Sequence, residues 1–500
     1  MTQFLKTSEY EAIARGLKFP TQAFVGGRFV DARSGRTMET INPATGETIA
    51  RVASCGKEDV DAAVACARRA FESGVWSRMH PGERKKTMLR LAGLMEKNLV
   101  ELAVLESVDS GKPLAACLSS DVPETVECIR WHAEYADKTY GCTSPSGDGT
   151  LGMIVKEPAG VVGCVLPWNF PLLMLAWKVG AAMSEGNSVV VKPASVTALT
   201  ALKVAELAAE AGVPEGVFNV VPGPGGEAGE ALGRHFDVDV LTFTGSTEVG
   251  RKFLQYSAES NLKRVVLELG GKSPFVVLDD VTDFAPVAAH AANAAFWNMG
   301  ENCTANSRII LPESKKDEFL EALLEELKGW KTGNPLDPEN VLGAIVSRAQ
   351  FDTIMGYIEK GKAEGAAVLT GGKALEIGKG LFIAPTVFDN VHPGHTIARE
   401  EIFGPVTAVL TARSNEDAVR LANDTCYGLQ ATLFTKNLVS AHQYAKALRA
   451  GTVSVNAYSE GDNATPFGGY KLSGFGGKDK GRESHEQYLE TKTIFINLEG

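Results

Sequence analysis

Apolar residues recur along the chain in two different patterns, and each pattern predicts a different kind of element. In the first part they return every three or four residues, which is typical of helices that bury one face. Amphipathic helices are therefore predicted at 58–71 and 83–108, the second from the spacing of Met88, Leu91, Met95, Leu99 and Leu102. From residue 160 onward the pattern changes to short apolar runs that alternate with helical stretches.

The apolar runs after residue 160 predict two sets of strands. The first set is Val161–Leu166, Ser188–Val191, Val217–Val221, Val240–Phe243 and Arg264–Glu268, with helices at about 197–211 and from 247. The second set is Pro274–Leu278, Ser307–Leu311, Val406–Leu410 and Thr452–Val455, with a charged helix at 313–329. Buried strands separated by helices are the signature of a parallel, doubly wound sheet. The predicted fold class is therefore α/β, with two such domains.

Composition narrows the class of protein. A chain of 500 residues is long enough for two or three domains. Its 61 acidic and 50 basic residues give a net charge of −11, which argues against nucleic acid as the main partner. No metal site is expected, because the eight cysteines form no CxxC pair and have no histidines at metal-ligand spacing. Scattered single cysteines are typical of reduced thiols, so a cytoplasmic location is expected.

Neither the N-terminal residues nor the uncharged stretch at 158–177 predicts a signal peptide or a membrane helix. Residues 1–16 have mixed charges and no apolar stretch of the kind that a signal peptide needs. Pro158–Trp177 is uncharged over a length that could cross a bilayer, but Pro167 and Pro171 flank Asn169 within it. A strand, a turn and a new helix fit this pattern better than a membrane helix.

Three segments at predicted strand ends have both a structural and a functional interpretation. Val165–Pro171 is either a proline-rich turn or a loop that presents the Asn169 amide at the sheet edge, where ligands bind in open α/β folds. Phe243–Gly250 opens a helix with small residues that let a phosphate approach backbone N–H groups, although it is not a GxGxxG. Gly223–Gly226 is as readily a turn as a cofactor contact.

Two further residues are candidates for chemistry. Glu268 is a carboxylate in an apolar strand that ends at two glycines. It is either a solvated strand end or a general base whose pKa is raised by burial. Cys303 lies in a polar segment, Gly300–Arg308, before a strand. A lone cysteine is usually inert and buried, but one in a polar loop is a better candidate for a reactive thiol.

Together these segments resemble the aldehyde dehydrogenase superfamily over essentially the whole chain. The matching motifs are PWNFP at 167–171, FTGS at 243–246, LELGGKS at 267–273, GxxCxxxxR at 300–308, EEIFGPV at 400–406 and PFGGYKxSG at 466–474. All six occur in the family's order and at its spacing, so the resemblance is specific.

The resemblance implies a role for each matching residue. Cys303 corresponds to the nucleophile, Glu268 to the base that activates water, and Asn169 to the amide of the oxyanion hole. Lys178 and Glu490 match residues that assist proton movement. The implied cofactor is NAD or NADP, with contacts expected from Trp168, Lys192, Ser195, Gly225, Gly245, Ser246, Glu401 and Phe403. No metal is required.

The resemblance also implies three structural parts. Residues 1–132 and 158–270 are expected to form a dinucleotide-binding domain, and 271–475 a catalytic domain. Residues 133–157 and 476–500 are expected to form a small β oligomerisation element. Dimers and tetramers are usual in the family, so a homodimer or homotetramer is expected.

Two departures from the commonest family pattern bear on specificity. Many NAD-preferring members have a Glu three residues after the Lys that corresponds to Lys192, and here that position is Ser195. Ser195 neither repels a 2′-phosphate nor chelates the ribose hydroxyls, so NADP is expected to be accepted beside NAD. In the 458–465 loop, Glu460 and Asp462 stand where many enzymes for fatty or aromatic aldehydes have apolar residues.

The acidic loop favours a particular class of small-molecule aldehyde. Its pattern ahead of PFGGYK resembles the γ-glutamyl-aminobutyraldehyde and other ω-aminoaldehyde dehydrogenases. A carboxylate at the tunnel mouth would attract a substrate ammonium, and aromatic faces also favour a cation. The alternative is a solvated loop without a substrate role. The expected tunnel walls are Phe170, Met174, Trp177, Phe296 and Phe467.

Two other functions compete with this one. A relative that passes the acyl group to coenzyme A would generally lack the water-activating Glu, and Glu268 is present. A structural relative without catalysis would not need Cys303, Glu268 and Asn169 together. The predicted function is therefore NAD(P)-dependent oxidation of an aldehyde to the carboxylic acid through a thioester on Cys303.

Overall fold

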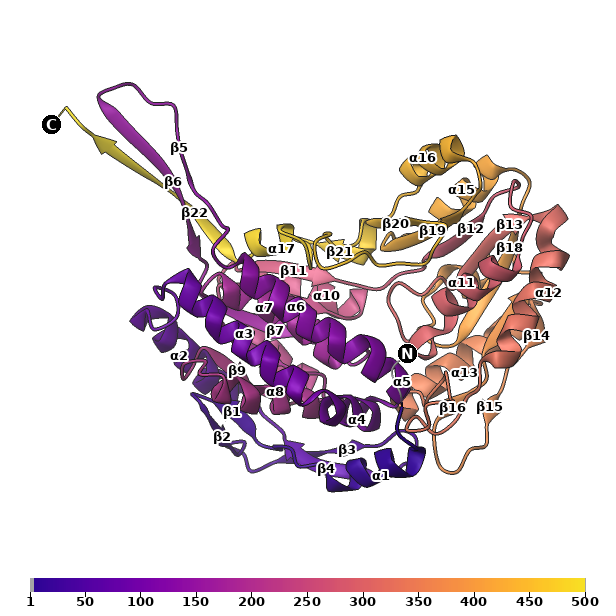
Figure 1. Cartoon of the computed structure of the whole chain (residues 1–500), viewed down its shortest axis with the longest axis horizontal. Helices are drawn as coiled ribbons and strands as arrows, with labels where there is room; N and C mark the ends of the chain where they lie inside the picture. Colours follow the sequence, from indigo (N-terminus) through magenta and orange to yellow (C-terminus); the bar gives the residue numbers. More distant parts are fainter. Residues whose placement is uncertain (1–3, 500) are drawn as a thin grey trace.

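The computed structural model describes residues 4–499, and two large sheets covered by helices organise them. The two sheets lie at opposite ends of the molecule, and a thin arm of strands projects from the first (Figure 1). The N-terminal part adds helix α1 (Thr7–Gly16) and the hairpin of β3 (Thr37–Ile41) and β4 (Thr48–Ala53). No helix within the described residues is both long and apolar enough to cross a membrane.

The first sheet has the strand order β2-β1-β9-β8-β7-β10-β11-β21. Its five central strands are parallel and buried, whereas β1, β2 and β21 at the edges are antiparallel. The parallel part of the sheet starts at β7, adds β8 and β9 on one side, and then adds β10 and β11 on the other. The strand order therefore reverses between β7 and β10, which is the position where open α/β sheets bind ligands. The strands are β1 (Ala23–Val25), β2 (Arg28–Val30), β7 (Val161–Val165), β8 (Ser188–Lys192), β9 (Phe218–Val220), β10 (Val240–Thr244), β11 (Arg264–Glu268) and β21 (Gly474–Phe475).

Helices cover both faces of this sheet, which explains the continuous apolar runs of its strands. They are α2 (Lys57–Ser73), α3 (Pro81–Lys97), α4 (Leu99–Ser110), α5 (Leu114–Ala116), α6 (Val122–Tyr135), α7 (Pro171–Ser184), α8 (Leu199–Glu210), α9 (Glu230–Arg234) and α10 (Thr247–Ala258). The single helix predicted at 83–108 is two helices. Asn98 ends α3, because its side-chain amide donates to the Leu94 carbonyl at 2.8 Å.

The second sheet has the order β14-β17-β18-β13-β12-β19-β20 and is parallel except for β14. The helix predicted at 313–329 is α12 (Lys316–Glu326) with a 3₁₀ turn at each end. The strands are β12 (Pro274–Val277), β13 (Arg308–Pro312), β14 (Ala367–Thr370), β17 (Thr386–Asp389), β18 (Val406–Ala412), β19 (Gln430–Phe434) and β20 (Thr452–Val455), and a small hairpin joins β15 (Ala374–Leu375) to β16 (Phe382–Ile383). The other helices are α11 (Ala285–Phe296), α13 (Arg348–Ala363), α14 (Thr396–Arg399), α15 (Asn415–Asn423) and α16 (Leu438–Ala447).

The arm is a three-stranded sheet of β5 (Cys142–Thr143), β6 (Thr150–Pro158) and β22 (Leu489–Asn497). β5 and β22 lie inside the bounds predicted for the oligomerisation element, whereas β6 ends at Pro158, one residue beyond them. The predicted element is longer than the arm, since α6 runs to Tyr135 and 476–488 return to the first domain through α17 (Glu483–Glu486). The chain also crosses back earlier than predicted. β21 belongs to the first sheet, pairing Gly474 with Glu268 of β11. The end of the chain therefore closes over the first domain.

Candidate active site

Five consecutive parallel strands of the first sheet end beside one another, and each end carries a predicted site residue. Lys192 ends β8, and Glu268 ends β11. Asn169 follows β7, Gly225 follows β9, and Ser246 follows β10. Because the carboxyl ends of parallel strands share one edge of a sheet, the topology brings these five residues to the same edge.

The second domain brings Cys303 to this edge on a turn between α11 and β13. Asn298, Met299 and Gly300 all have left-handed φ angles, of 53°, 56° and 67°. A Cβ at Gly300 would lie 2.1 Å from the Gly404 carbonyl oxygen, and one at Gly271 would lie 2.5 Å from the Cys303 carbonyl oxygen. A side chain therefore has no room at Gly300 in the turn or at Gly271 in the segment packed against it. This close packing holds Cys303 at the junction of the two domains.

One pocket of about 300 Å³ joins the two domains at this point. It reaches from the start of α10 to the Cys303 thiol, so the motifs that are far apart in sequence share one cavity. The predicted residues that line it are Trp168, Asn169, Phe170, Met174, Trp177, Gly245, Ser246, Glu268, Cys303, Glu401, Phe403, Glu460 and Phe467. Leu173, Gln350, Thr353 and Tyr357 line it as well and were not predicted.

Seven predicted residues do not line this pocket: Lys178, Lys192, Ser195, Gly225, Phe296, Asp462 and Glu490. Two of them, Phe296 and Glu490, do not have the surroundings that were expected. Phe296 is fully buried in the core of the second domain, where its ring packs against Trp330 at 6.1 Å, so its assignment to the tunnel wall is wrong. Helix α11 turns this side chain inward, toward the sheet. Glu490 lies on β22 with an exposed side chain that pairs with Arg264 at 2.9 Å. It does not pair with Lys178.

The carboxylate that reaches Lys178 belongs to Asp479. The Lys178 ammonium lies 3.0 Å from the Asp479 carboxylate and donates to the Thr242 hydroxyl at 3.1 Å, and both members of the ion pair are completely buried. Sequence reasoning missed Asp479. The only signal was its place in the charged run 478–480, shortly after the PFGGYK motif.

The Asn169 amide is already oriented before any substrate binds. Its side-chain N–H₂ donates to the Glu301 carbonyl oxygen at 3.1 Å. An amide nitrogen carries two N–H bonds, so one remains for a second acceptor. Because Glu301 is two residues before Cys303, the free N–H is held close to the nucleophile, as an oxyanion hole requires.

Burial and negative charge surround the thiol and the base. The pKa of Cys303 is raised well above its usual value by burial, and the carboxylates of Glu460, Glu401 and Glu268 raise it further. Burial and the charge of Asp479 likewise hold the pKa of Glu268 well above its usual range. Neither carboxyl oxygen of Glu268 has a hydrogen-bond partner among the described residues. A general base that must accept a proton from water needs such a free oxygen and a raised pKa.

The edge of the first sheet fits a dinucleotide. Ser246 caps α10 and leaves backbone N–H groups at the helix start available to a pyrophosphate. The Lys192 amine is buried, has its pKa lowered to about 8 by that burial, and donates to the Pro193 carbonyl. Ser195 is half-buried just beyond β8, and the space where a Cβ of Gly225 would stand is open.

The second domain supplies a carboxylate to the same groove. Glu401 accepts from the Gly271 N–H at 2.8 Å, and its pKa is raised to about 7 by burial. A Cβ at Gly270 would lie 2.1 Å from the other carboxyl oxygen, so only glycine fits beneath it. Phe403, with a left-handed φ of 57°, packs edge-on against Trp168 at 5.2 Å. These contacts hold a carboxylate and two rings where a nicotinamide ribose and ring are expected.

A second chamber of about 500 Å³ opens beside the pocket, and Trp177, Trp297 and Glu460 line both. Its other charged residues are Glu124, Asp462 and Lys480. Glu460 faces inward and accepts from the Thr304 hydroxyl, whereas Asp462 is exposed on the loop.

A lysine of the protein itself occupies the aromatic wall. The Lys480 ammonium lies 4.9 Å from the centre of the Trp177 ring and 5.6 Å from that of Phe467, and it donates to the Glu460 carbonyl at 3.1 Å. The expectation that these faces attract a substrate cation is therefore corrected, because Lys480 already fills that position. Only the carboxylates of the chamber remain for a substrate ammonium.

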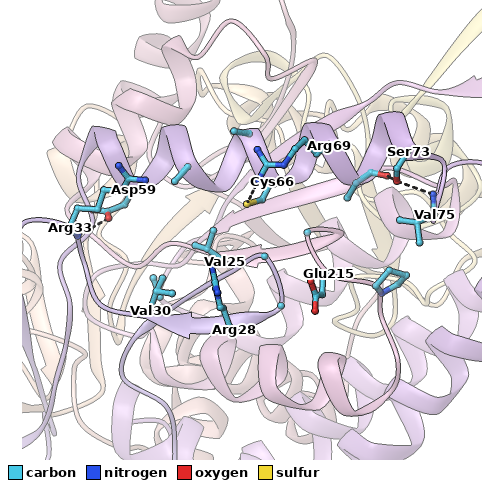
Figure 2. Close-up of a pocket in the computed structure, with 18 of the residues that line it drawn as sticks. Val25, Arg28, Val30, Arg33, Asp59, Cys66, Arg69, Ser73, Val75 and Glu215 are labelled. Atoms are coloured by element: carbon cyan, nitrogen blue, oxygen red, sulfur yellow. Dashed lines mark hydrogen bonds between the residues drawn. The ribbon is translucent and has the colours of Figure 1, made fainter.

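A larger hollow lies elsewhere in the molecule. A groove of about 960 Å³ runs between α2 and the β1–β2 hairpin (Figure 2). Cys66 faces it and accepts a hydrogen bond from Arg69 at 3.0 Å. Between residues 4 and 499 there is no group of three or more His, Cys, Asp or Glu side chains that could hold a metal ion.

Comparisons with known proteins agree with this geometry. Residues 29–494 match the family described as aldehyde dehydrogenase family. The chain is 56% identical to an aminoacetaldehyde dehydrogenase of Pseudomonas aeruginosa, over 99% of this chain and 100% of the relative. It is 44% identical to the NADP/NAD-dependent aldehyde dehydrogenase PuuC of Escherichia coli, over 97% of each. A solved structure of P. syringae AldA, an indole-3-acetaldehyde dehydrogenase in complex with NAD⁺ and IAA, superposes with a TM-score of 0.97 at 47% identity, covering 99% of this chain and 100% of that one.

Proposed function

Since the chain belongs to the aldehyde dehydrogenase family, we propose that it oxidises an ω-amino- or γ-glutamylamino-aldehyde, with Cys303 as the nucleophile. Family membership itself makes the protein an NAD(P)-dependent aldehyde dehydrogenase. The observation that carries the proposal is the single pocket in which Cys303, Glu268 and Asn169 meet, with an acidic chamber beside it.

In the proposed mechanism the Cys303 thiolate attacks the aldehyde carbon and forms a tetrahedral thiohemiacetal. The free N–H of Asn169 and the backbone N–H of Cys303 hold the oxyanion, and each such donor is typically worth about 3 kcal/mol. The thioester that follows must be hydrolysed. Glu268, with two free carboxyl oxygens, is proposed to take the proton from the attacking water.

The cofactor would be held across the edge of the first sheet. Lys192 and Ser195 would contact the adenosine ribose, Ser246 the pyrophosphate, and Glu401 and Phe403 the nicotinamide end. NAD or NADP held there would supply the acceptor for the hydride that leaves the substrate carbon. Glu401 accepts the Gly271 N–H and is thereby fixed in position, so it would orient the ribose without rearranging. Lys178 and Asp479 form a charged pair close to Glu268 that is proposed to assist the movement of its proton.

The substrate class rests on the outer chamber and on the relatives. Glu124 and Asp462 add negative charge to the chamber, against the single positive charge of Lys480. A substrate with an ammonium beyond its aldehyde is attracted there, and an uncharged chain of equal length is not. The relative with 56% identity acts, by its name, on aminoacetaldehyde, which is such a substrate.

Steady-state kinetics at 340 nm with 4-aminobutanal and butanal test the proposal. The aminoaldehyde is expected to have the higher kcat/KM. In Asp462→Asn, KM for 4-aminobutanal should rise about threefold to tenfold, because one exposed carboxylate contributes about 1 kcal/mol, and KM for butanal should stay unchanged. Asp317→Asn removes an exposed carboxylate of α12 and is the matched control. If both aldehydes respond alike to Asp462→Asn, the acidic loop does not select the substrate.

We further propose a cytoplasmic homodimer or homotetramer. The support for assembly is the arm, whose strand β22 is exposed along most of its length and presents Ile494 and Phe495 to solvent, the latter 65% exposed. Apolar side chains on a projecting strand are typical of an interface between subunits. Light scattering of the purified protein measures the number of subunits, and a monomer would contradict the proposal.

A further inference from the structure

A buried ion pair lies directly behind the proposed oxyanion-hole residue. The Lys112 ammonium is 2.5 Å from the Asp121 carboxylate, and both side chains are removed from solvent, with 2% and 0% exposure. The same ammonium donates to the main-chain carbonyl oxygen of Asn169 at 3.2 Å. It also lies 3.8 Å from the centre of the Phe170 ring. Burying two charges is costly because both lose their hydration.

Local backbone features bring the two charges together. Helix α4 ends at Gly111, whose φ of 83° turns the chain so that Lys112 points back into the domain. The carboxylate comes from a π-helical turn, Cys117–Asp121, at the start of α6. π-Helical turns are rare and are frequently found at functional sites, because the extra residue redirects one side chain. Here the redirected side chain is Asp121.

Asn169 is held at both of its ends. Its carbonyl oxygen accepts from Lys112 and also from the Asn298 amide at 3.1 Å. Its side-chain amide donates to the Glu301 carbonyl, to which Asn298 donates as well, at 3.0 Å. The direction of the free N–H of Asn169 is therefore set by where its peptide group is clamped. Of the two side chains on that carbonyl, only Lys112 comes from the first domain.

We propose that Lys112, held by Asp121, is a positioning residue for Asn169, clamping its peptide so that the side-chain amide meets the oxyanion. The neighbouring Glu106 cannot take the place of Lys112, because its carboxylate is a hydrogen-bond acceptor. It accepts the Leu172 N–H at the start of α7. Without the Lys112 hydrogen bond, Asn169 is still present, but its side-chain N–H is no longer directed at the oxyanion. A displacement of about 1 Å at such a donor typically slows a reaction by about 100-fold.

Single-turnover formation of NADH measures the step that needs the oxyanion hole. The variant Lys112→Met/Asp121→Leu removes both charges of the pair, so neither is left buried without its partner. Its single-turnover rate constant is expected to fall about tenfold to 100-fold. The affinity for NAD and the rate of Cys303 alkylation by iodoacetamide, neither of which needs an oxyanion hole, are expected to stay within twofold. A control removes a remote ion pair, Lys316→Met/Asp389→Leu, and should leave the rate unchanged.

A cycle with Asn169→Ala decides whether Lys112 acts through Asn169. In the Asn169→Ala background the Lys112→Met/Asp121→Leu change should have no further effect on the single-turnover rate constant. An effect of equal size in that background would overturn the proposal. An unchanged rate constant in the enzyme that retains Asn169 would overturn it as well. If the double variant does not fold, Lys112→Gln, which is too short to reach the carbonyl, enters the same cycle and is judged by the same outcomes. The inference rests on the proposed role of Asn169. A wild-type rate in Asn169→Ala alone refutes that role, whereas a slow Asn169→Ala with a fast Lys112 variant refutes only the positioning.

Discussion

Replacing Gly468 with alanine is a one-methyl change that should disable the proposed general base alone. Gly468 has a φ of 155°, and a Cβ there would lie 2.5 Å from a Glu268 carboxyl oxygen and 2.7 Å from the Lys478 Cδ. An unstrained carbon–oxygen contact is about 3.3–3.6 Å. The carboxylate must therefore move by about 1 Å, away from the place where it would meet the hydrolytic water.

A displacement of about 1 Å at a catalytic group typically costs about 100-fold, which corresponds to about 2.7 kcal/mol in the barrier. Since Glu268 is proposed to act after hydride transfer, Gly468→Ala should still release one NADH per active site in a rapid burst. Steady-state turnover should then fall about 100-fold. Stopped-flow absorbance at 340 nm separates the burst from the steady state, and Glu268→Gln should give the same two-phase trace.

The strained backbone at position 468 requires a stability control. Alanine at this φ costs about 1–3 kcal/mol of folding free energy, so thermal unfolding should confirm that the variant is native at the assay temperature. Gly356→Ala, in a helix where a Cβ meets nothing within 4 Å, is the matched substitution and should behave as wild type. Equal loss of burst and steady state would refute the reasoning, because it would place the effect of the methyl group before deacylation.

Three further outcomes are expected at the cofactor groove and the thiol. Gly270→Ala pushes on Glu401 and should raise KM for NAD about tenfold while slowing the burst, which initial rates at varied NAD would show. Ser195→Glu places a carboxylate beside the expected 2′-phosphate site and should lower kcat/KM for NADP about 100-fold or more. The kcat/KM for NAD should not fall. Unchanged NADP kinetics would show that Lys192 and other contacts decide the cofactor preference. Because the pKa of Cys303 is raised, its alkylation by iodoacetamide should accelerate about tenfold per pH unit between pH 7 and 9, and a flat profile would mean that the thiolate is already formed.

Much of the site could be predicted because each residue lies in a motif at the end of an element. The apolar runs at 161–166, 240–243 and 264–268 correspond to β7, β10 and β11, and the residues that follow them reach one edge through the topology of parallel strands. Cys303 was predictable for a different reason. Cys303 lies in a polar turn between two apolar elements, α11 and β13. Reactive side chains are commonly found on such turns.

Two of the residues that were missed lack any local signal. Lys112 and Asp121 read in sequence as ordinary polar residues at a helix end and in a turn, and only the folded chain brings them behind Asn169. Phe296 shows the opposite error. It was expected in the tunnel wall, but α11 directs it into the core of the second domain. Periodicity predicts that a helix has a buried face, but not which of two buried environments each side chain enters.

The segment 478–480 shows why register matters more here than composition. Phe467 and Asp479 exchange two backbone hydrogen bonds, of 2.6 and 2.8 Å, which fix this segment against the PFGGYK motif. In this register Lys478 donates to the Gly468 carbonyl beside Glu268, Asp479 pairs with Lys178, and Lys480 lies on the Trp177 ring. A shift by one residue would set a lysine against Lys178 in a site that is completely buried. Three consecutive residues on this bridge therefore contact the base, the buried ion pair and the substrate chamber in turn.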